Sequence, residues 1–128
     1  KQLNTSYILQ GRINKHIRHS KSYLFHDKIL QKKFESFSLT SNIKFQLTEY
    51  IKGGYYIWHE DNTEGRIQTH SVLLNNNFIG GELELEIYGD VLLSIGDCIS
   101  FDSALSHQIK PLTMGIRYSL VAWVYQTI

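Results

Sequence analysis

Apolar and polar positions alternate along this chain with two different periods. Residues 26–37 carry apolar side chains at the spacing of an α-helix, with Asp27 near the start, and this pattern predicts a helix. From Ile43 to Tyr50 the period is two, as in a β-strand with one face turned to a core. Ile13 and Ile17 are four residues apart, which indicates a further short amphipathic helix near the start of the chain.

After residue 42 the chain consists of short runs of β-strand character that are separated by turn residues such as Gly53-Gly54 and Gly80-Gly81. The expected strands after the early one at 22–25 are 43–50, 55–59, 66–74, 82–87, 91–93, 98–101, 107–110 and 116–125. Many short strands with little helix predict a β-sandwich or barrel. We expect one domain over 1–128, in which 1–42 forms a helical support region and 43–128 the core.

Length and composition agree with that expectation and restrict the cellular setting. A chain of 128 residues is long enough to bury a core of its own. Cys98 is the only cysteine, so no internal disulfide can form, and this favours the reducing cytoplasm. We find neither a signal-peptide pattern nor an apolar run of about 20 residues, so no membrane partner is expected.

The charges are unevenly placed along the chain. Residues 1–33 carry eight Lys and Arg against Asp27 alone, whereas residues 34–128 carry five against eleven acidic residues. A basic lobe could attract a nucleic-acid backbone, but a committed nucleic-acid binder usually carries a larger net positive charge than the +1 of this chain. We therefore interpret the basic region as a solvated face and do not expect a nucleic-acid partner.

The candidate chemistry centres on His59 and Asp61, which are two residues apart at the end of an expected strand. Residues i and i+2 of a strand point to the same face, so an imidazole and a carboxylate would project together. His107 can supply a second imidazole from a neighbouring strand. Two histidines and one carboxylate on one face of a metal form the facial triad of non-haem Fe(II) oxygenases.

The residues around this triad resemble a known family. The spacing Tyr50-x-x-Gly53-x-x-Tyr56-x-x-His59-x-Asp61 resembles the signature of Fe(II)/2-oxoglutarate dioxygenases of the prolyl 4-hydroxylase type. The resemblance continues to about Trp123 through residues that stand in the family's order: Arg66-x-x-Thr69, Leu74-Asn75, Gly80-Gly81-Glu82-Leu83, Gly96-Asp97, Phe101-x-Ser103, His107, Pro111 and Gly115-x-Arg117-Tyr118-Ser119. It covers somewhat over half of the chain, and the first forty residues match only loosely.

The resemblance implies a fold, a reaction and roles for individual residues. The fold is mainly β, a double-stranded β-helix (jelly-roll) barrel with supporting N-terminal helices. The reaction oxidises a substrate C–H bond with O₂ while 2-oxoglutarate is decarboxylated to succinate, and ascorbate is a further cofactor that it allows. Iron would be bound by His59, Asp61 and His107. The residues implied at the 2-oxoglutarate site are Arg117, Ser119, Tyr50 and Tyr56.

Arg117 stands ten residues after His107, and its guanidinium fork suits the distal carboxylate of 2-oxoglutarate. Ser119 shares its face of the strand. In the animal oxygen-sensing branch of the family, a tyrosine before the Leu-Asn pair helps to hold 2-oxoglutarate, whereas this chain has Leu73 there. Ser119 or Tyr50 could take over that role. This chain looks closer to the compact bacterial or phage members.

The substrate that the resemblance favours is a prolyl residue of a peptide or protein. Alternatives with the same chemistry are a free amino acid, another small molecule and a nucleic-acid base. Two further alternatives are a non-catalytic jelly-roll binding module and a cupin-like metalloenzyme such as an isomerase, which would not need Arg117. Sequence patterns leave the oligomeric state open.

Overall fold

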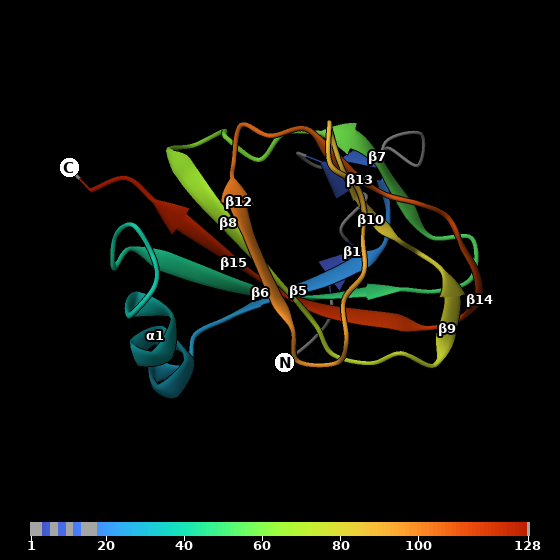
Figure 1. The fold of residues 1–128 in the computed structure, drawn as a ribbon, viewed down its shortest axis with the longest axis horizontal. Helices are drawn as coiled ribbons and strands as arrows, with labels where there is room; N and C mark the ends of the chain where they lie inside the picture. Colours follow the sequence, from blue (N-terminus) through green and yellow to red (C-terminus); the bar gives the residue numbers. More distant parts are fainter. Residues whose placement is uncertain (1–3, 6–7, 10–11, 14–17, 128) are drawn as a thin grey trace.

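Two antiparallel β-sheets face each other in the computed structural model, which describes residues 4–5, 8–9, 12–13 and 18–127 (Figure 1). The larger sheet has six strands, in the order β1 (Asn4–Thr5), β5 (Lys21–Phe25), β6 (Ile43–Tyr50), β15 (Arg117–Tyr125), β8 (Arg66–Leu73) and β12 (Cys98–Asp102). The smaller sheet has five, in the order β11 (Gly89–Val91), β10 (Leu83–Leu85), β13 (His107–Ile109), β7 (Tyr55–His59) and β4 (Arg18–His19). The mainly-β jelly-roll fold that the sequence predicts is confirmed.

Two short strand pairs complete the described structure. One pair joins β9 (Phe78–Gly80) to β14 (Leu112–Gly115), and the other joins β2 (Ile8–Leu9) to β3 (Arg12–Ile13). The sequence did not indicate β9 or β14, because Gly80 and Gly115 stand in them where turns are expected. No helix in the described residues has the length and apolar character to cross a membrane.

The outer face of the larger sheet is covered by the helix α1 (Lys28–Glu35). Its start is fixed by Asp27, whose Oδ1 accepts hydrogen bonds from the backbone N–H groups of Ile29 (2.9 Å) and Leu30 (3.0 Å). Phe34 is the buried residue of the helix, and its ring centroid lies 5.3 Å from that of Phe45. The cluster beneath the helix consists of apolar side chains that alternate along β6 and β15: Ile43, Phe45, Leu120, Ala122 and Val124.

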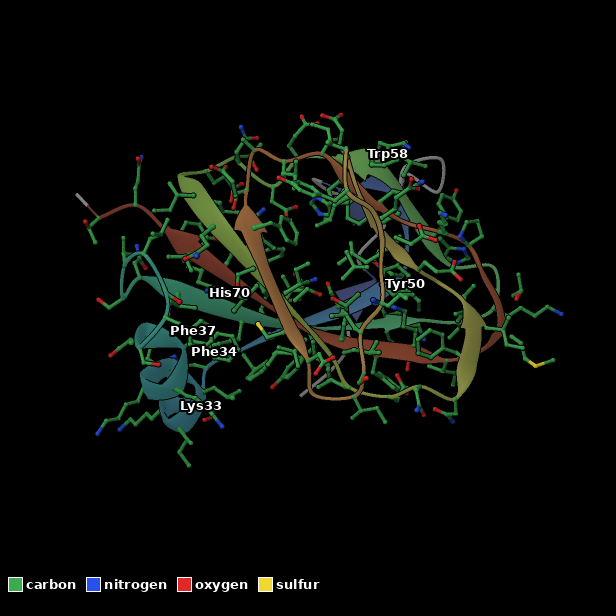
Figure 2. The ribbon with its side chains drawn as sticks, viewed as in Figure 1. Lys33, Phe34, Phe37, Tyr50, Trp58 and His70 are labelled. Carbon is green, nitrogen blue, oxygen red and sulfur yellow. The ribbon has the colours of Figure 1, made fainter. Side chains whose placement is uncertain are left out.

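A buried histidine also joins the helix region to this outer face. His70 of β8 is fully buried, and Figure 2 shows it beside Phe34 and Phe37. Its Nε2 lies 2.9 Å from Ser38 Oγ and its Nδ1 2.6 Å from Ser100 Oγ. His70 is therefore a structural residue rather than a metal ligand.

The larger sheet is buried on its inner face as well, and this face is polar. Most inward positions of its three central strands are occupied by polar or partly polar side chains, and Val121 is an apolar exception; the polar set is Gln46, Thr48, Tyr50, Thr69, Ser71, Arg117, Ser119 and Trp123. They line a cavity between the two sheets. The apolar contacts between the sheets lie beside it, in a cluster of Tyr50, Leu83, Leu85, Phe101, Ile109 and Leu112.

The structure differs from the expectations at two places. The predicted helical support over 1–42 consists, in the described residues, of a single helix together with strands. Ile13 lies in β3, where it pairs with Ile8 across a ladder, and Ile17 lies outside the described residues. A spacing of four does not by itself distinguish a helix from two short strands.

The second difference concerns the expected strands 82–87 and 91–93. Strand β10 ends at Leu85, because the chain turns there: the Tyr88 N–H donates to the Leu85 carbonyl (3.2 Å) and Ile87 adopts a φ of 75°. Strand β11 therefore begins at Gly89, two residues before the expected start.

Candidate active site

His59 and His107 lie opposite each other on neighbouring strands of the smaller sheet. His59 ends β7 and His107 begins β13, and the two residues are direct partners in the antiparallel register. Asp61 follows two residues after His59, where the chain leaves the strand, and its backbone N–H donates to the Ser103 carbonyl (2.8 Å). The sheet register thus brings together residues that are almost fifty positions apart in the sequence.

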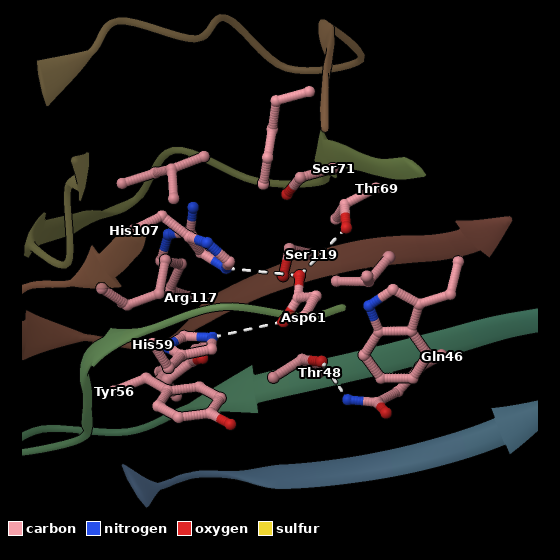
Figure 3. A pocket seen from close by; sticks show the side chains of 16 residues that line it. Gln46, Thr48, Tyr56, His59, Asp61, Thr69, Ser71, His107, Arg117 and Ser119 are labelled. Carbon is pink, nitrogen blue, oxygen red and sulfur yellow. Dashed lines mark hydrogen bonds and ion pairs between the residues drawn. The ribbon is translucent and has the colours of Figure 1, made fainter. Parts of the chain in front are cut away.

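The side chains of these three residues converge on one point (Figure 3). His59 Nε2 lies 3.5 Å from Asp61 Oδ1, and His107 Nε2 lies 3.4 Å from Asp61 Oδ2. One donor atom from each residue can be chosen so that all lie within 4.8 Å of one another. Asp61 and His107 are buried, and His59 is partly exposed at the mouth of the cavity.

The other nitrogen of each ring determines which tautomer is present. His59 Nδ1 is 2.7 Å from the Ile57 carbonyl oxygen, and His107 Nδ1 is 3.1 Å from the Leu105 carbonyl oxygen. A carbonyl oxygen can only accept, so each Nδ1 carries the hydrogen and each neutral ring presents the lone pair of its Nε2 to the centre. Backbone carbonyls that orient histidines in this way are typical of metal sites.

The carboxylate of Asp61 is held from the opposite side. The Thr69 hydroxyl donates to Asp61 Oδ2 (3.0 Å), and Thr69 Oγ1 lies 3.0 Å from Ser103 Oγ. Thr69 has one hydroxyl hydrogen, which Asp61 uses, so Ser103 must donate to Thr69. Ser103 is fully buried, and this chain of two hydroxyls fixes the direction of the carboxylate.

Ring packing and burial further restrict the two imidazoles. Tyr56 stacks on His59 with ring centroids 3.4 Å apart, and Phe101 meets His107 edge to face at 4.9 Å. Burial lowers the pKa of His107, although the Asp61 charge opposes this effect. Burial would raise the pKa of Asp61, but His59, His107 and Thr69 together outweigh it and lower that pKa. These shifts favour neutral imidazole at His107 and ionised carboxylate at Asp61, which are the states that a metal requires.

The donor set fits a transition-metal ion. Three lone-pair donors point at one another, and no hydrogen is left on either Nε2 to bridge them to the carboxylate. A cation between them would remove this repulsion. Two imidazoles and one carboxylate suit Fe(II) in particular and leave other coordination positions open.

Arg117 is buried in the wall of the same cavity, where it has no anionic partner. Its side chain makes no hydrogen bond or ion pair with any described residue. The guanidinium carbon lies 5.9 Å from the Tyr50 ring centroid and 6.0 Å from that of Phe78. Burial lowers the pKa of Arg117, with Tyr50 and Glu82 opposing, but a guanidinium stays protonated in proteins. An unpaired buried cation beside a cavity indicates a site for an anionic ligand.

Gly81 makes room for Arg117. An added Cβ on Gly81 would lie 3.1 Å from Arg117 Cδ and 2.9 Å from Leu112 Cδ1, and the residue has a φ of 66°. The glycine pair that the sequence places before β10 therefore has a direct role at the site, since a side chain at Gly81 would meet the stem of Arg117.

All seven site residues expected from the sequence line one cavity: Tyr50, Tyr56, His59, Asp61, His107, Arg117 and Ser119. Their geometry agrees with the expected roles, which themselves stay predictions. Five further residues stand in or behind the wall of the cavity, and the sequence alone did not indicate a role for them: Gln46, Thr48, Thr69, Ser71 and Ser103. The period-two pattern of β6, followed on its polar face, would have pointed to Gln46 and Thr48.

The chain is similar in sequence to a known protein family and to a curated protein. Residues 45–125 match the family model of the 2OG-Fe(II) oxygenase superfamily. A curated PKHD-type hydroxylase of Cupriavidus metallidurans is 29% identical over 85 residues, which cover 62% of this chain and 37% of that protein. The chain therefore spans little more than a third of the length of this relative.

Solved structures agree on the fold. A prolyl-4-hydroxylase of Pseudomonas putida superposes with a TM-score of 0.83 at 20% identity, over 97% of this chain and 78% of that one. A prolyl hydroxylase of Trichoplax adhaerens, in complex with a hypoxia inducible factor peptide fragment, superposes with a TM-score of 0.76 at 24% identity, over 96% and 70%. At such identities the likeness establishes the fold alone.

Proposed function

Because this chain belongs to the 2OG-Fe(II) oxygenase superfamily, we propose that it hydroxylates a C–H bond of a prolyl residue in a peptide or protein. One atom of O₂ enters the substrate C–H bond. The other enters succinate, which forms with CO₂ from 2-oxoglutarate. The observation that carries the proposal is the pairing, in one cavity, of the His59-Asp61-His107 cluster with an unpaired buried Arg117.

His59, Asp61 and His107 would hold Fe(II) through two imidazole nitrogens and a carboxylate oxygen. Bound Fe(II) supplies open coordination positions for the 2-oxo acid and O₂, and the redox chemistry between them. The protein's part is to hold the imidazoles in the orientation and tautomer that direct Nε2 to the metal, through the Ile57 and Leu105 carbonyls, and to hold the carboxylate through the Thr69 hydroxyl. Thr69 therefore acts as a positioning residue.

Arg117 would bind the distal carboxylate of 2-oxoglutarate. A cupin-like isomerase would not need this buried cation, whereas a dicarboxylate would neutralise it. Ser119 lies two residues further on the same face, is buried, and lines the same cavity, so its hydroxyl would add a donor. Tyr50, paired with Arg117 in the register, closes the cavity on the β6 side.

The surface beside the mouth supports an apolar peptide substrate. Trp58 directly precedes His59 and is exposed, as is Ile57. Figure 2 shows Trp58 at the edge of the molecule, on the side where β7 ends. Exposed aromatic surface next to a reactive centre favours contact with a partner. The Trichoplax relative, which was solved with a peptide, supports the same substrate class. Ascorbate as a further cofactor and a cytoplasmic location stay predictions.

The substrate is tested by incubating the protein with Fe(II), 2-oxoglutarate, O₂ and a library of proline-containing peptides, followed by mass spectrometry. We expect a mass increase of one oxygen on proline, with stoichiometric succinate. Peptides in which alanine replaces proline are the matched control. Oxidation of a free amino acid, another small molecule or a base, with the peptides unchanged, would transfer the chemistry to that substrate.

The cosubstrate site is tested separately by titrating the Fe(II)-loaded protein with 2-oxoglutarate under anaerobic conditions and recording the visible charge-transfer band. We expect a band that Arg117→Ala weakens, because the variant loses a charge-assisted contact. An absent band, with iron shown to be bound, would favour a binding module or a cupin-like enzyme.

A further inference from the structure

Three strands meet side by side at the level of Ser119. In the register of the larger sheet, Ser119 of β15 pairs with Thr48 of β6 on one side and with Leu73 of β8 on the other. Leu73 has no polar atom in its side chain. The hydroxyl groups that this level of the sheet can offer to a ligand beside Arg117 therefore come from Ser119 and Thr48.

Thr48 carries a buried hydroxyl with an unused hydrogen. The residue is 1% exposed and lines the same cavity as Arg117. Its Oγ1 accepts a hydrogen bond of 3.0 Å from Gln46 Nε2. No other hydrogen bond of this hydroxyl occurs within the described part of the chain. Buried donors are nearly always paired, so the hydrogen of Thr48 is available to a ligand in the cavity.

Gln46 determines how that hydroxyl points. It stands two residues before Thr48 on the same face of β6 and is 5% exposed. Figure 3 shows the hydrogen bond between the two side chains. Because the Gln46 amide N–H occupies a lone pair of Thr48 Oγ1, the hydroxyl hydrogen must point away from Gln46. The amide thus prepares Thr48 to donate rather than to accept.

We propose that Thr48 binds the distal carboxylate of 2-oxoglutarate together with Arg117 and Ser119, and that Gln46 is the positioning residue that keeps Thr48 a donor. The inference rests on the proposed function of the site. The Thr48 hydroxyl on β6 then supplies a hydrogen-bond donor that Leu73, which has an apolar side chain, cannot provide. Since the donor acts on a carboxylate, it favours 2-oxoglutarate over 2-oxo acids that end in a methyl group.

The test is calorimetric binding to the Fe(II)-loaded protein without O₂, which does not depend on turnover. Two ligands of equal chain length are compared, 2-oxoglutarate and 2-oxopentanoate, and only the former has a distal carboxylate. We expect Thr48→Val, which keeps the shape of the side chain, to weaken 2-oxoglutarate about 10-fold, as for one lost hydrogen bond to a charged group. Binding of 2-oxopentanoate should not change.

Further variants separate a binding role from a structural one. Thr48→Ser keeps the hydroxyl and should restore affinity, whereas Gln46→Leu should lose part of it, with KM for 2-oxoglutarate raised more than kcat is lowered. Thr113→Val, which changes an exposed threonine of β14, is the matched control and should bind as the unchanged protein does. If Thr48→Val does not fold, Thr48→Ala is compared with Thr48→Ser in the same way.

The outcomes distinguish the two proposals. If Thr48→Val binds 2-oxoglutarate normally while Arg117→Ala loses it, the role of Thr48 is wrong and the proposed function stands. Equal weakening of both 2-oxo acids would also overturn the inference, because it would indicate a change of shape. If the unchanged protein binds iron but no 2-oxoglutarate, the proposed function itself fails.

Discussion

Replacement of Gly81 by alanine should weaken 2-oxoglutarate binding although it replaces no side chain that is proposed to bind the ligand. The new Cβ would lie 2.9 Å from Leu112 Cδ1 and 3.1 Å from Arg117 Cδ. Both neighbours are buried, with 1% and 3% exposure, so neither can move outward to make room. The expected result is a shift of the Arg117 side chain, which carries its guanidinium away from the carboxylate.

The substitution should have two effects, a loss of stability from backbone strain and a loss of affinity for 2-oxoglutarate, and a control variant separates them. An alanine in the left-handed region costs about 1–2 kcal/mol of stability. Gly89 has a φ of 82°, similar to the 66° of Gly81, but nothing lies within 4 Å of its added Cβ. Gly89→Ala therefore carries the backbone strain alone. In Gly81→Ala, displacement of Arg117 would also remove a charge-assisted hydrogen bond to 2-oxoglutarate. This loss costs about 1.5–3 kcal/mol of binding free energy, or roughly 10- to 100-fold in affinity.

Urea unfolding and calorimetry together measure both parts. Both variants should lose stability, and only Gly81→Ala should lose affinity for 2-oxoglutarate in the Fe(II)-loaded protein. The reasoning is refuted if Gly81→Ala and Gly89→Ala bind 2-oxoglutarate equally well. It is also refuted if Gly81→Ala weakens 2-oxopentanoate as much as 2-oxoglutarate, because Arg117 would then not be the affected group.

Other parts of the molecule give shorter predictions. Thr69→Val should lower iron affinity about 10- to 100-fold while Thr69→Ser stays close to the unchanged protein, as measured by competition with a chelator. Burial lowers the pKa of His70, so its stabilising effect is present above the unfolded value of about 6.5 and is lost as the pH falls through the folded value. Urea unfolding of His70→Gln should therefore depend less on pH below that value. Asp27→Ala removes the cap of α1 and should cost about 1 kcal/mol in the same assay.

The sequence predicts the fold and the grouping of the candidate metal ligands best where local pattern and tertiary structure agree. The expected strands 43–50, with its period-two pattern, and 55–59, with its aromatic residues, match β6 and β7 residue for residue. The spacing of His59 and Asp61 indicates that they share a face, and the family resemblance adds His107, whose strand pairs with β7 in the structure. Such features depend on short segments whose preferences the final structure does not override.

Features that depend on distant contacts could not be predicted in this way. The pairing of β10 with the chain before β13 continues past Leu85, where the Glu86 N–H donates to the Ser106 carbonyl (2.9 Å), twenty residues away in the sequence. The support that Thr69 gives Asp61 likewise needs Ser103 to lie behind both. A serine or threonine in a strand carries no local sign of such a partner.

The two faces of the larger sheet have separate physical tasks. A search of the sequence for apolar core positions therefore does not find the polar residues of the inner face. Phe45 and Leu120 pack on the outer face under α1, whereas Thr48 and Ser119 line the cavity on the inner face. Stability of the sheet therefore comes mainly from apolar burial on the side away from the site. Inner positions can then carry unpaired donors that a core would not tolerate, because a ligand satisfies them. It follows that conservative substitutions on the inner face should alter binding more than unfolding free energy, and that the reverse should hold for the outer face.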